Sequence, residues 1–114
     1  MADIDMDLVF AVEALADELD VHNHQPKKQE YSKPELMSGK LTSESIACAL
    51  GNLMPENAII ADESVSSGRG FMPFTQGVNP HDWLALTGGS IGLGLPYATG
   101  AAIACPDRKV ICTE

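Results

Sequence analysis

The stretch Leu86-Thr87-Gly88-Gly89-Ser90-Ile91-Gly92-Leu93-Gly94-Leu95-Pro96 places four glycines between two apolar segments. Residues 83–86 before it predict a short buried strand. The small residues at 98–104 after it predict a helix with Pro96 in its first turn. Glycines at such a junction let the backbone approach a ligand closely and place amides at a helix N-terminus. The stretch therefore predicts either a ligand-binding turn or a tight strand-to-helix connection.

Two further apolar runs, at residues 58–61 and 109–113, also predict short strands. Between Thr42, a good helix cap, and Pro55, which ends a helix, apolar residues recur at helical spacing. A short helix is also expected around residues 66–72. Alternating helices and strands indicate an α/β fold, here a partial parallel sheet with flanking helices.

The first forty residues differ from the rest. Residues 4–19 carry an apolar stripe at spacings of four, three and four, which predicts a helix whose stripe needs a packing partner. Residues 21–40 have two prolines, several lysines and no regular period, as in a linker. We therefore expect three parts: residues 1–20, a linker at 21–40, and residues 41–114.

Composition excludes several classes of function. The chain has 114 residues and a net charge of −9, with seven acids and no base in the first twenty residues. This charge argues against binding nucleic acid or anionic lipid. No apolar run reaches the ~20 residues that a membrane span needs. Cys48, Cys105 and Cys112 lie among apolar neighbours, which favours reduced thiols and a cytoplasmic protein.

Three known glycine-containing motifs bear on this stretch. The dinucleotide fingerprint G-x-G-x-x-G fails, since its last position would be Tyr97, and no phosphate-binding G-K-[ST] occurs. The hydrolase motif G-x-S-x-G is met literally at residues 88–92, with Ser90 at the nucleophile position. That fold needs a later histidine, whereas the last one here is His81, so a serine hydrolase is the weaker alternative.

A second candidate site follows the strand predicted at residues 58–61. Residues 62–70, Asp-Glu-Ser-Val-Ser-Ser-Gly-Arg-Gly, combine three hydroxyls, backbone amides and a cation. In parallel sheets ligands bind beyond the carboxyl ends of strands, so this loop could hold an anion such as phosphate. The alternative is an ordinary loop in which Ser66 or Ser67 caps a helix.

Together these segments resemble a known family. Residues 55–64 (PENAIIADES), 87–101 (TGGSIGLGLPYATGA) and 106–111 (PDRKVI) are similar, in order, to thiamine-diphosphate-dependent 2-oxoacid enzymes of the acetolactate synthase large-subunit and benzoylformate decarboxylase type. The resemblance implies that residues 41–114 are the N-terminal half of the cofactor-binding domain. Residues 1–20 would be the last helix of a preceding domain.

The resemblance also implies roles for individual residues. Ile91 would support the bent cofactor, and its amide would donate to the pyrimidine ring. The Gly89 carbonyl would accept from the cofactor's 4′-amino group, with Ser90 between them. Val65 and Ser66 would contact the diphosphate. No catalytic residue and no metal ligand is expected on this chain.

The resemblance finally implies what a complete enzyme would add. In the family, a Gly-Asp-Gly motif and a later Asn hold Mg²⁺, and a separate domain supplies an activating Glu. We therefore expect a fragment of a larger enzyme that acts on a small 2-oxoacid by carboligation or decarboxylation, and that binds the cofactor weakly or not at all when isolated. We also expect a homo-oligomer. The alternative is a non-catalytic, self-associating α/β module.

Overall fold

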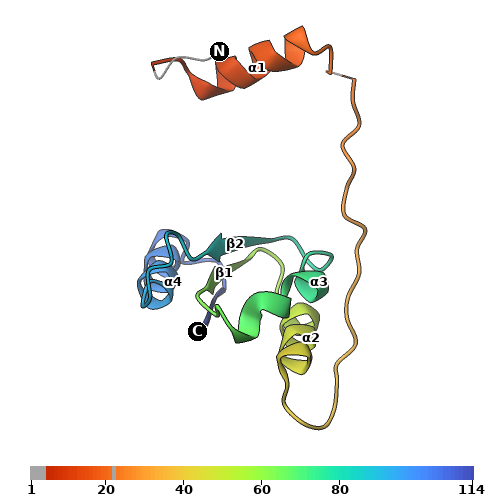
Figure 1. Cartoon of the computed structure of the whole chain (residues 1–114), viewed down its shortest axis with the longest axis vertical. Helices are drawn as coiled ribbons and strands as arrows, with labels where there is room; N and C mark the ends of the chain where they lie inside the picture. The colour runs from red at the N-terminus through yellow and green to blue at the C-terminus, as the bar shows by residue number, and fades with distance from the viewer. Residues whose placement is uncertain (1–4, 22) are drawn as a thin grey trace.

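A computed structural model describes residues 5–21 and 23–114 of the chain. Its helices and strands are arranged as the sequence predicts for an α/β protein, and the strands form one sheet (Figure 1). In chain order the elements are α1 (Leu8–Glu18), α2 (Ser43–Leu53), β1 (Ala58–Asp62), the 3₁₀ helix η1 (Ser67–Gly70), α3 (Met72–Thr75), β2 (His81–Ala85), α4 (Gly94–Ala104) and β3 (Val110–Thr113).

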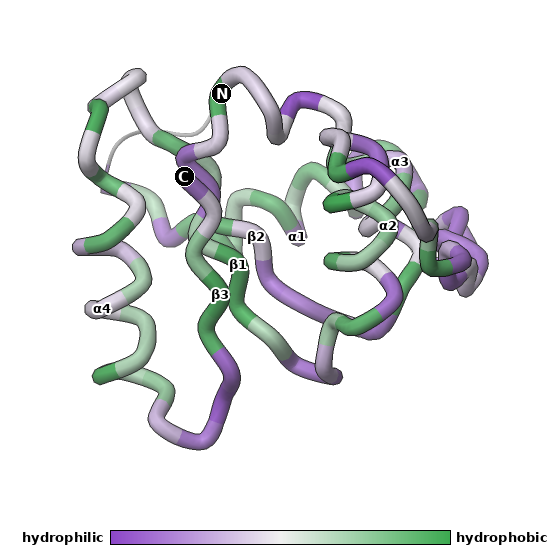
Figure 2. The backbone as a smooth tube through the Cα atoms, turned by 90° about the horizontal axis from the view of Figure 1, so that it is seen from below, coloured by the Kyte–Doolittle hydropathy of each residue, from purple (hydrophilic) through white to green (hydrophobic). Residues whose placement is uncertain are grey.

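The sheet has three parallel strands in the order β2-β1-β3. Central strand β1 pairs Ile60 with Trp83 on one side and with Ile111 on the other. Its first four residues are all buried, as expected for a strand covered on both faces. Figure 2 shows the sheet between α4 on one side and α2 with α3 on the other. The expected parallel α/β architecture is thus confirmed.

Helix α2 is defined by its ends. Thr42 and Ser45 form a reciprocal capping box, in which each backbone amide donates to the other's hydroxyl at 2.8 Å and 3.1 Å. Met54 then turns extended before Pro55, which cannot continue the helix. The apolar side of α2 meets the sheet in a core of buried or partly buried side chains: Leu50, Met54, Ala58, Ile60, Val78, Trp83 and Ile111.

Two sequence-based boundaries need correction. The second strand was expected at residues 83–86 but spans His81–Ala85, because its polar first residues pair with β1. Directly before the first strand pair, the Pro80 carbonyl accepts from the Asn57 amide at 2.7 Å, which aligns the starts of β1 and β2. The short helix expected around residues 66–72 is instead two single-turn helices, η1 and α3.

Helix α1 stands apart from the sheet (Figure 1). Its described part begins after Asp7, whose carboxylate accepts from the Phe10 amide at 3.0 Å. None of its residues is buried, and the predicted stripe, for example Leu8 and Leu15, is exposed. The first part of the predicted 4–19 helix, residue 4, lies outside the described residues.

The described residues between α1 and Leu41 form no helix or strand, in agreement with the irregular segment expected there. This segment is tied to the folded part at two points: the Ser32 amide donates to the Gly77 carbonyl, and the Asn52 side chain donates to the Pro34 carbonyl at 2.8 Å. Within residues 5–21 and 23–114, the helices are too short and insufficiently apolar to cross a bilayer.

Candidate functional site

The candidate site lies where the three parallel strands end. The loop after β1, the glycine turn after β2 and Glu114 after β3 meet at this edge, because parallel strands place their carboxyl ends together. They enclose a pocket of about 440 Å³. Its lining combines apolar, hydroxyl and acidic side chains with glycine backbone: Glu63, Ser64, Val65, Ser66, Leu86, Gly89, Ile91 and Glu114.

Four of the five residues that the sequence predicts for the site line this one pocket. Val65 and Ser66 come from the loop after β1, and Gly89 and Ile91 come from the turn after β2. Ser90 lies between the latter two but does not line the pocket. The structure therefore brings two separated segments of the chain together, while their contact with a cofactor stays a prediction.

The glycine turn has a conformation that other residues rarely adopt. Gly88 and Gly89 have φ of 66°, and Gly92 has φ of 86°. An added Cβ at any of the three would meet no atom within 4 Å, so backbone conformation rather than lack of space requires glycine. Ile91, between them, is 95% exposed. The turn thus presents open backbone and one apolar side chain, as a ligand-binding turn would.

Asp62, the last residue of β1, joins all three strands at this edge. Its carboxylate accepts from the Trp83 indole at 3.1 Å on β2, from the Thr113 hydroxyl at 2.8 Å on β3, and from the amide and hydroxyl of Ser64. Burial raises the pKa of Asp62, but these hydrogen bonds outweigh it, so the net shift is downward. An ionised Asp62 therefore fixes the positions of the strand ends.

Glu63 connects the two loops of the pocket. Its carboxylate accepts from the Gly92 amide and, at 2.6 Å, from the Gly94 amide, at the start of α4. The hydrogen bonds from Gly94 and Gly92 lower the pKa of Glu63 despite some desolvation. The sequence pattern predicts no partner for Glu63 or Asp62, since an acid after a strand gives no sign of hydrogen-bond partners about thirty residues away.

The acids around the pocket also affect a cysteine. Burial, a hydrogen bond from Cys112 to the Glu114 carboxylate, and the charges of Glu114, Glu63 and Asp62 raise the pKa of Cys112 to about 11. Cys112 is therefore protonated at neutral pH and is a poor nucleophile. Arg69 is the nearby cation, and its Nε donates to the Val65 carbonyl at 2.7 Å beside an adjoining hollow of about 280 Å³.

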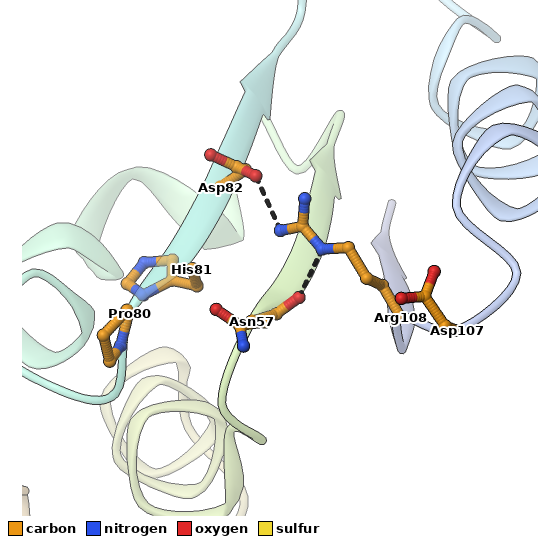
Figure 3. A pocket seen from close by; sticks show the side chains of 6 residues that line it. All are labelled: Asn57, Pro80, His81, Asp82, Asp107 and Arg108. Atoms are coloured by element: carbon orange, nitrogen blue, oxygen red, sulfur yellow. Dashed lines mark hydrogen bonds and ion pairs between the residues drawn. The ribbon is translucent and has the colours of Figure 1, made fainter.

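The opposite edge of the sheet has a different character (Figure 3). A pocket of about 340 Å³ lies there, at the amino ends of the strands, and Arg108 crosses it. The Arg108 guanidinium donates to the carbonyls of Asn57 at 2.7 Å and Ala58 at 3.2 Å, and to the Asp82 carboxylate at 2.6 Å. Arg108 thus links the start of β1 to β2, which indicates a structural role.

The structure gives no support to the serine hydrolase alternative. His81 begins β2 and its Nδ1 lies 2.7 Å from the Asn79 carbonyl, at the edge opposite the turn that holds Ser90. His24 lies in the irregular segment, and His22 is outside the described residues. Among the described residues, Ser90 forms no hydrogen bond with a histidine. In the same part of the chain, no three acids, cysteines or histidines are placed to hold a metal ion.

Comparison with known proteins identifies the family. The protein IlvX of Mycobacterium tuberculosis, named as an acetolactate synthase large subunit, is 49% identical over 104 residues, which are 91% of this chain and 20% of IlvX. Benzoylformate decarboxylase of Pseudomonas aeruginosa is 29% identical over 92% of this chain and 20% of its own length. The chain belongs to this thiamine-diphosphate-dependent family.

This membership confirms the resemblance that the three sequence segments predict. A shorter match, with 59% identity over 34 residues, is to the large subunit of acetolactate synthase isozyme 1 of Escherichia coli, and covers 29% of this chain and 6% of that subunit. The chain spans about a fifth of the length of IlvX and of the decarboxylase. No family model and no solved structure matches it.

Proposed function

We propose that this chain forms one wall of a thiamine-diphosphate pocket in an enzyme that acts on 2-oxoacids. The observation that carries the proposal is the single pocket that brings Val65 and Ser66 together with Gly89 and Ile91. Family membership supports the cofactor, because relatives over most of the chain are an acetolactate synthase large subunit and a decarboxylase of 2-oxoacids of the benzoylformate type.

The pocket suits the organic part of the cofactor. Free space around Gly89 lets a flat ring reach backbone groups, and the exposed Ile91 side chain supplies an apolar surface for it to rest on. When bound, thiamine diphosphate supplies the electron sink that decarboxylation of a 2-oxoacid requires. The role of this chain is to bind and orient: the Gly89 carbonyl accepts, the Ile91 amide donates, and the Ile91 side chain excludes water.

This chain offers fewer groups to the diphosphate than to the rings of the cofactor. The amides at the start of α4 are already occupied by Glu63, so we assign the diphosphate to the Ser66 side of the pocket. Glu63 and Glu114 add negative charge there, which opposes an anion unless a cation balances it. Mg²⁺ would do so, and the resemblance to the family assigns its ligands to the Gly-Asp-Gly motif and the later Asn.

Calorimetric titration of thiamine diphosphate with Mg²⁺ tests the proposal. We expect weak binding to this chain, and tighter binding when the chain is fused to the residues that follow the matched segment in IlvX. In the fused protein Ile91→Ala should weaken binding at least tenfold. Ile103→Ala, which truncates an equally large exposed side chain on α4, should not. Absence of binding to both proteins would overturn the proposal.

The exposed stripe of α1 favours a second proposal, that the chain self-associates. Leu8, Val12, Leu15 and Leu19 are each at least 58% exposed, and such a stripe is stabilised by packing against another surface. Light scattering should then show dimers or larger species of this chain, and Leu15→Lys should shift them toward monomer. A monodisperse monomer of the unchanged chain would contradict this proposal. We also propose a cytoplasmic location, in keeping with the three free cysteines.

A further inference from the structure

We propose that Glu63 is a positioning residue that holds the glycine turn in the conformation which accepts the cofactor. This inference rests on the function proposed above and adds to it a residue outside the predicted contacts. Both carboxylate oxygens of Glu63 accept backbone amides of the turn, one from Gly92 and the other from Gly94. The carboxylate therefore controls two points of the turn that carries Gly89 and Ile91.

Glu63 is itself firmly placed. It follows Asp62, whose carboxylate joins all three strands, and its own amide donates to the Thr113 carbonyl at 2.8 Å. Its backbone is thus an extension of the β1–β3 ladder. A side chain anchored in this way can transfer the rigidity of the sheet to the loop that it contacts.

Other hydrogen bonds hold the turn more loosely. The Thr87 hydroxyl lies 3.5 Å from the Ala85 carbonyl at the end of β2. The Leu93 amide donates to Ser90 at 3.3 Å within the turn, and the Tyr97 hydroxyl lies 3.5 Å from the Thr87 hydroxyl. Three of its glycines have positive φ and open surroundings, so the backbone itself does little to restrict the turn. Among the described residues, Glu63 thus makes the shortest contacts between the turn and the strand ends.

The turn is also shaped to receive this carboxylate. An added Cβ on Gly94 would lie 3.0 Å from the Glu63 Cβ and 2.8 Å from a Glu114 carboxylate oxygen, so a glycine is needed for close approach. The Gly94 amide is the first donor of α4, where a negative charge is favoured, and Gly92 lies two residues before it. Glutamine would offer only one oxygen and would turn an amide group toward the second N–H.

The consequence for the pocket is geometric. Val65 and Ser66 lie two and three residues after Glu63, while Gly89 and Ile91 precede the amides that Glu63 binds. One side chain therefore sets the distance between the two walls of the pocket. A ligand that touches both walls depends on Glu63, whereas a ligand that touches only the Ser66 wall does not.

The test compares the unchanged 114-residue chain with Glu63→Gln and with Glu56→Gln. Glu56 is an exposed glutamate before β1, at the opposite edge of the sheet, so this control removes the same charge without touching the turn. In ¹⁵N-labelled protein, Glu63→Gln should speed amide exchange of Gly92 and Gly94 at least tenfold and leave Ile60 in the core unchanged. Equal exchange at both glycines in all three proteins would overturn the inference.

Ligand titrations separate positioning from a general structural effect. With Mg²⁺ present, Glu63→Gln should weaken thiamine diphosphate at least tenfold but inorganic pyrophosphate less than threefold, since pyrophosphate needs only the Ser66 wall. Equal weakening of both ligands, or of neither, would overturn the positioning role. If the unchanged chain and its IlvX fusion bind no thiamine diphosphate, the proposed function fails, while the exchange rates still decide whether Glu63 holds the turn.

If Glu63→Gln does not fold, the unchanged chain provides the measurement. Acidification protonates Glu63 and should release the amides of Gly92 and Gly94. Their protection factors, which compare each exchange rate with the intrinsic rate at the same pH, should then fall, while that of Ile60 stays high. Asp62, Cys112 and Glu114 are the other titratable groups near this carboxylate. Repeating the titration in Asp62→Asn removes the contribution of the Asp62 carboxyl from the measured change. Protection of Gly92 and Gly94 that persists through the titration of Glu63 would overturn the inference.

Discussion

The amino and carboxyl edges of the same three-stranded sheet differ in how their polar groups are used. At the amino edge, Arg108 crosses the pocket and donates to the carbonyls of Asn57 and Ala58 and to the Asp82 carboxylate. At the carboxyl edge, Asp62 links the strand ends through its hydrogen bonds to Trp83 and Thr113. The glycine backbone of the neighbouring turn has free space around it. The difference indicates that one edge maintains the fold and that the other is available for a ligand.

The strongest test of this comparison removes the connection at the carboxyl edge. Asp62→Ala leaves the Trp83 indole and the Thr113 hydroxyl without their acceptor. We expect a loss of about 2–3 kcal/mol in the free energy of unfolding, measured by urea denaturation. Asp107→Ala, an exposed acid at the other edge, is the control. A loss below about 0.5 kcal/mol would show that Asp62 does not hold the strand ends.

Removing the clamp at the amino edge should have a somewhat smaller effect. Arg108→Ala frees the carbonyls of Asn57, which is exposed, and of Ala58, which is buried. We expect a loss of about 1–2 kcal/mol in the free energy of unfolding. Lys109→Ala, the neighbouring cation, should change the free energy of unfolding by less than about 0.5 kcal/mol. If Arg108→Ala weakened cofactor binding as much as it weakened the fold, the separation of the two edges would be wrong.

A substitution in the glycine turn should reduce the free energy of unfolding less than the two substitutions above, and should reduce cofactor affinity more. Gly89→Ala forces a side chain into a left-handed conformation, which costs about 1 kcal/mol. Gly100→Ala is the matched control, since Gly100 lies within α4, has open space and has no positive φ. It should be neutral or stabilising. Cofactor affinity should fall for Gly89→Ala alone, and equal affinities would argue against backbone recognition at this turn.

Acid should weaken the carboxyl edge gradually. The folded pKa of Asp62 lies below its usual value of 3.8, so ionised Asp62 stabilises the fold above that value. Its contribution is lost as the pH falls through the lower, folded pKa. Thermal denaturation from pH 6 down to pH 3 should therefore show a steeper decline in the unchanged chain than in Asp62→Asn. Parallel curves would exclude Asp62 as a source of the acid sensitivity.

Much of this architecture could be predicted from the sequence. The apolar runs at residues 58–61 and 109–113 became β1 and β3, and the glycine-rich stretch lies beside the loop of Ser66 as the resemblance implies. Periodicity did not reveal the start of β2, because His81 and Asp82 are polar residues that join the ladder through their backbones. Nor did it reveal Glu63, whose partners are backbone amides that carry no sequence signal.

The order of the strands has a consequence for synthesis of the chain. Central strand β1 is made before either neighbour, and its residue Ile59 pairs with Val110, about fifty residues later. Until Thr113 has left the ribosome, β1 has one open side and Asp62 lacks one of its donors. Pairings this distant in sequence form slowly. The chain therefore leaves unpaired, during translation, the strand that is most buried in the finished fold. A chaperone that shields unpaired strands would have its largest effect on yield at this stage.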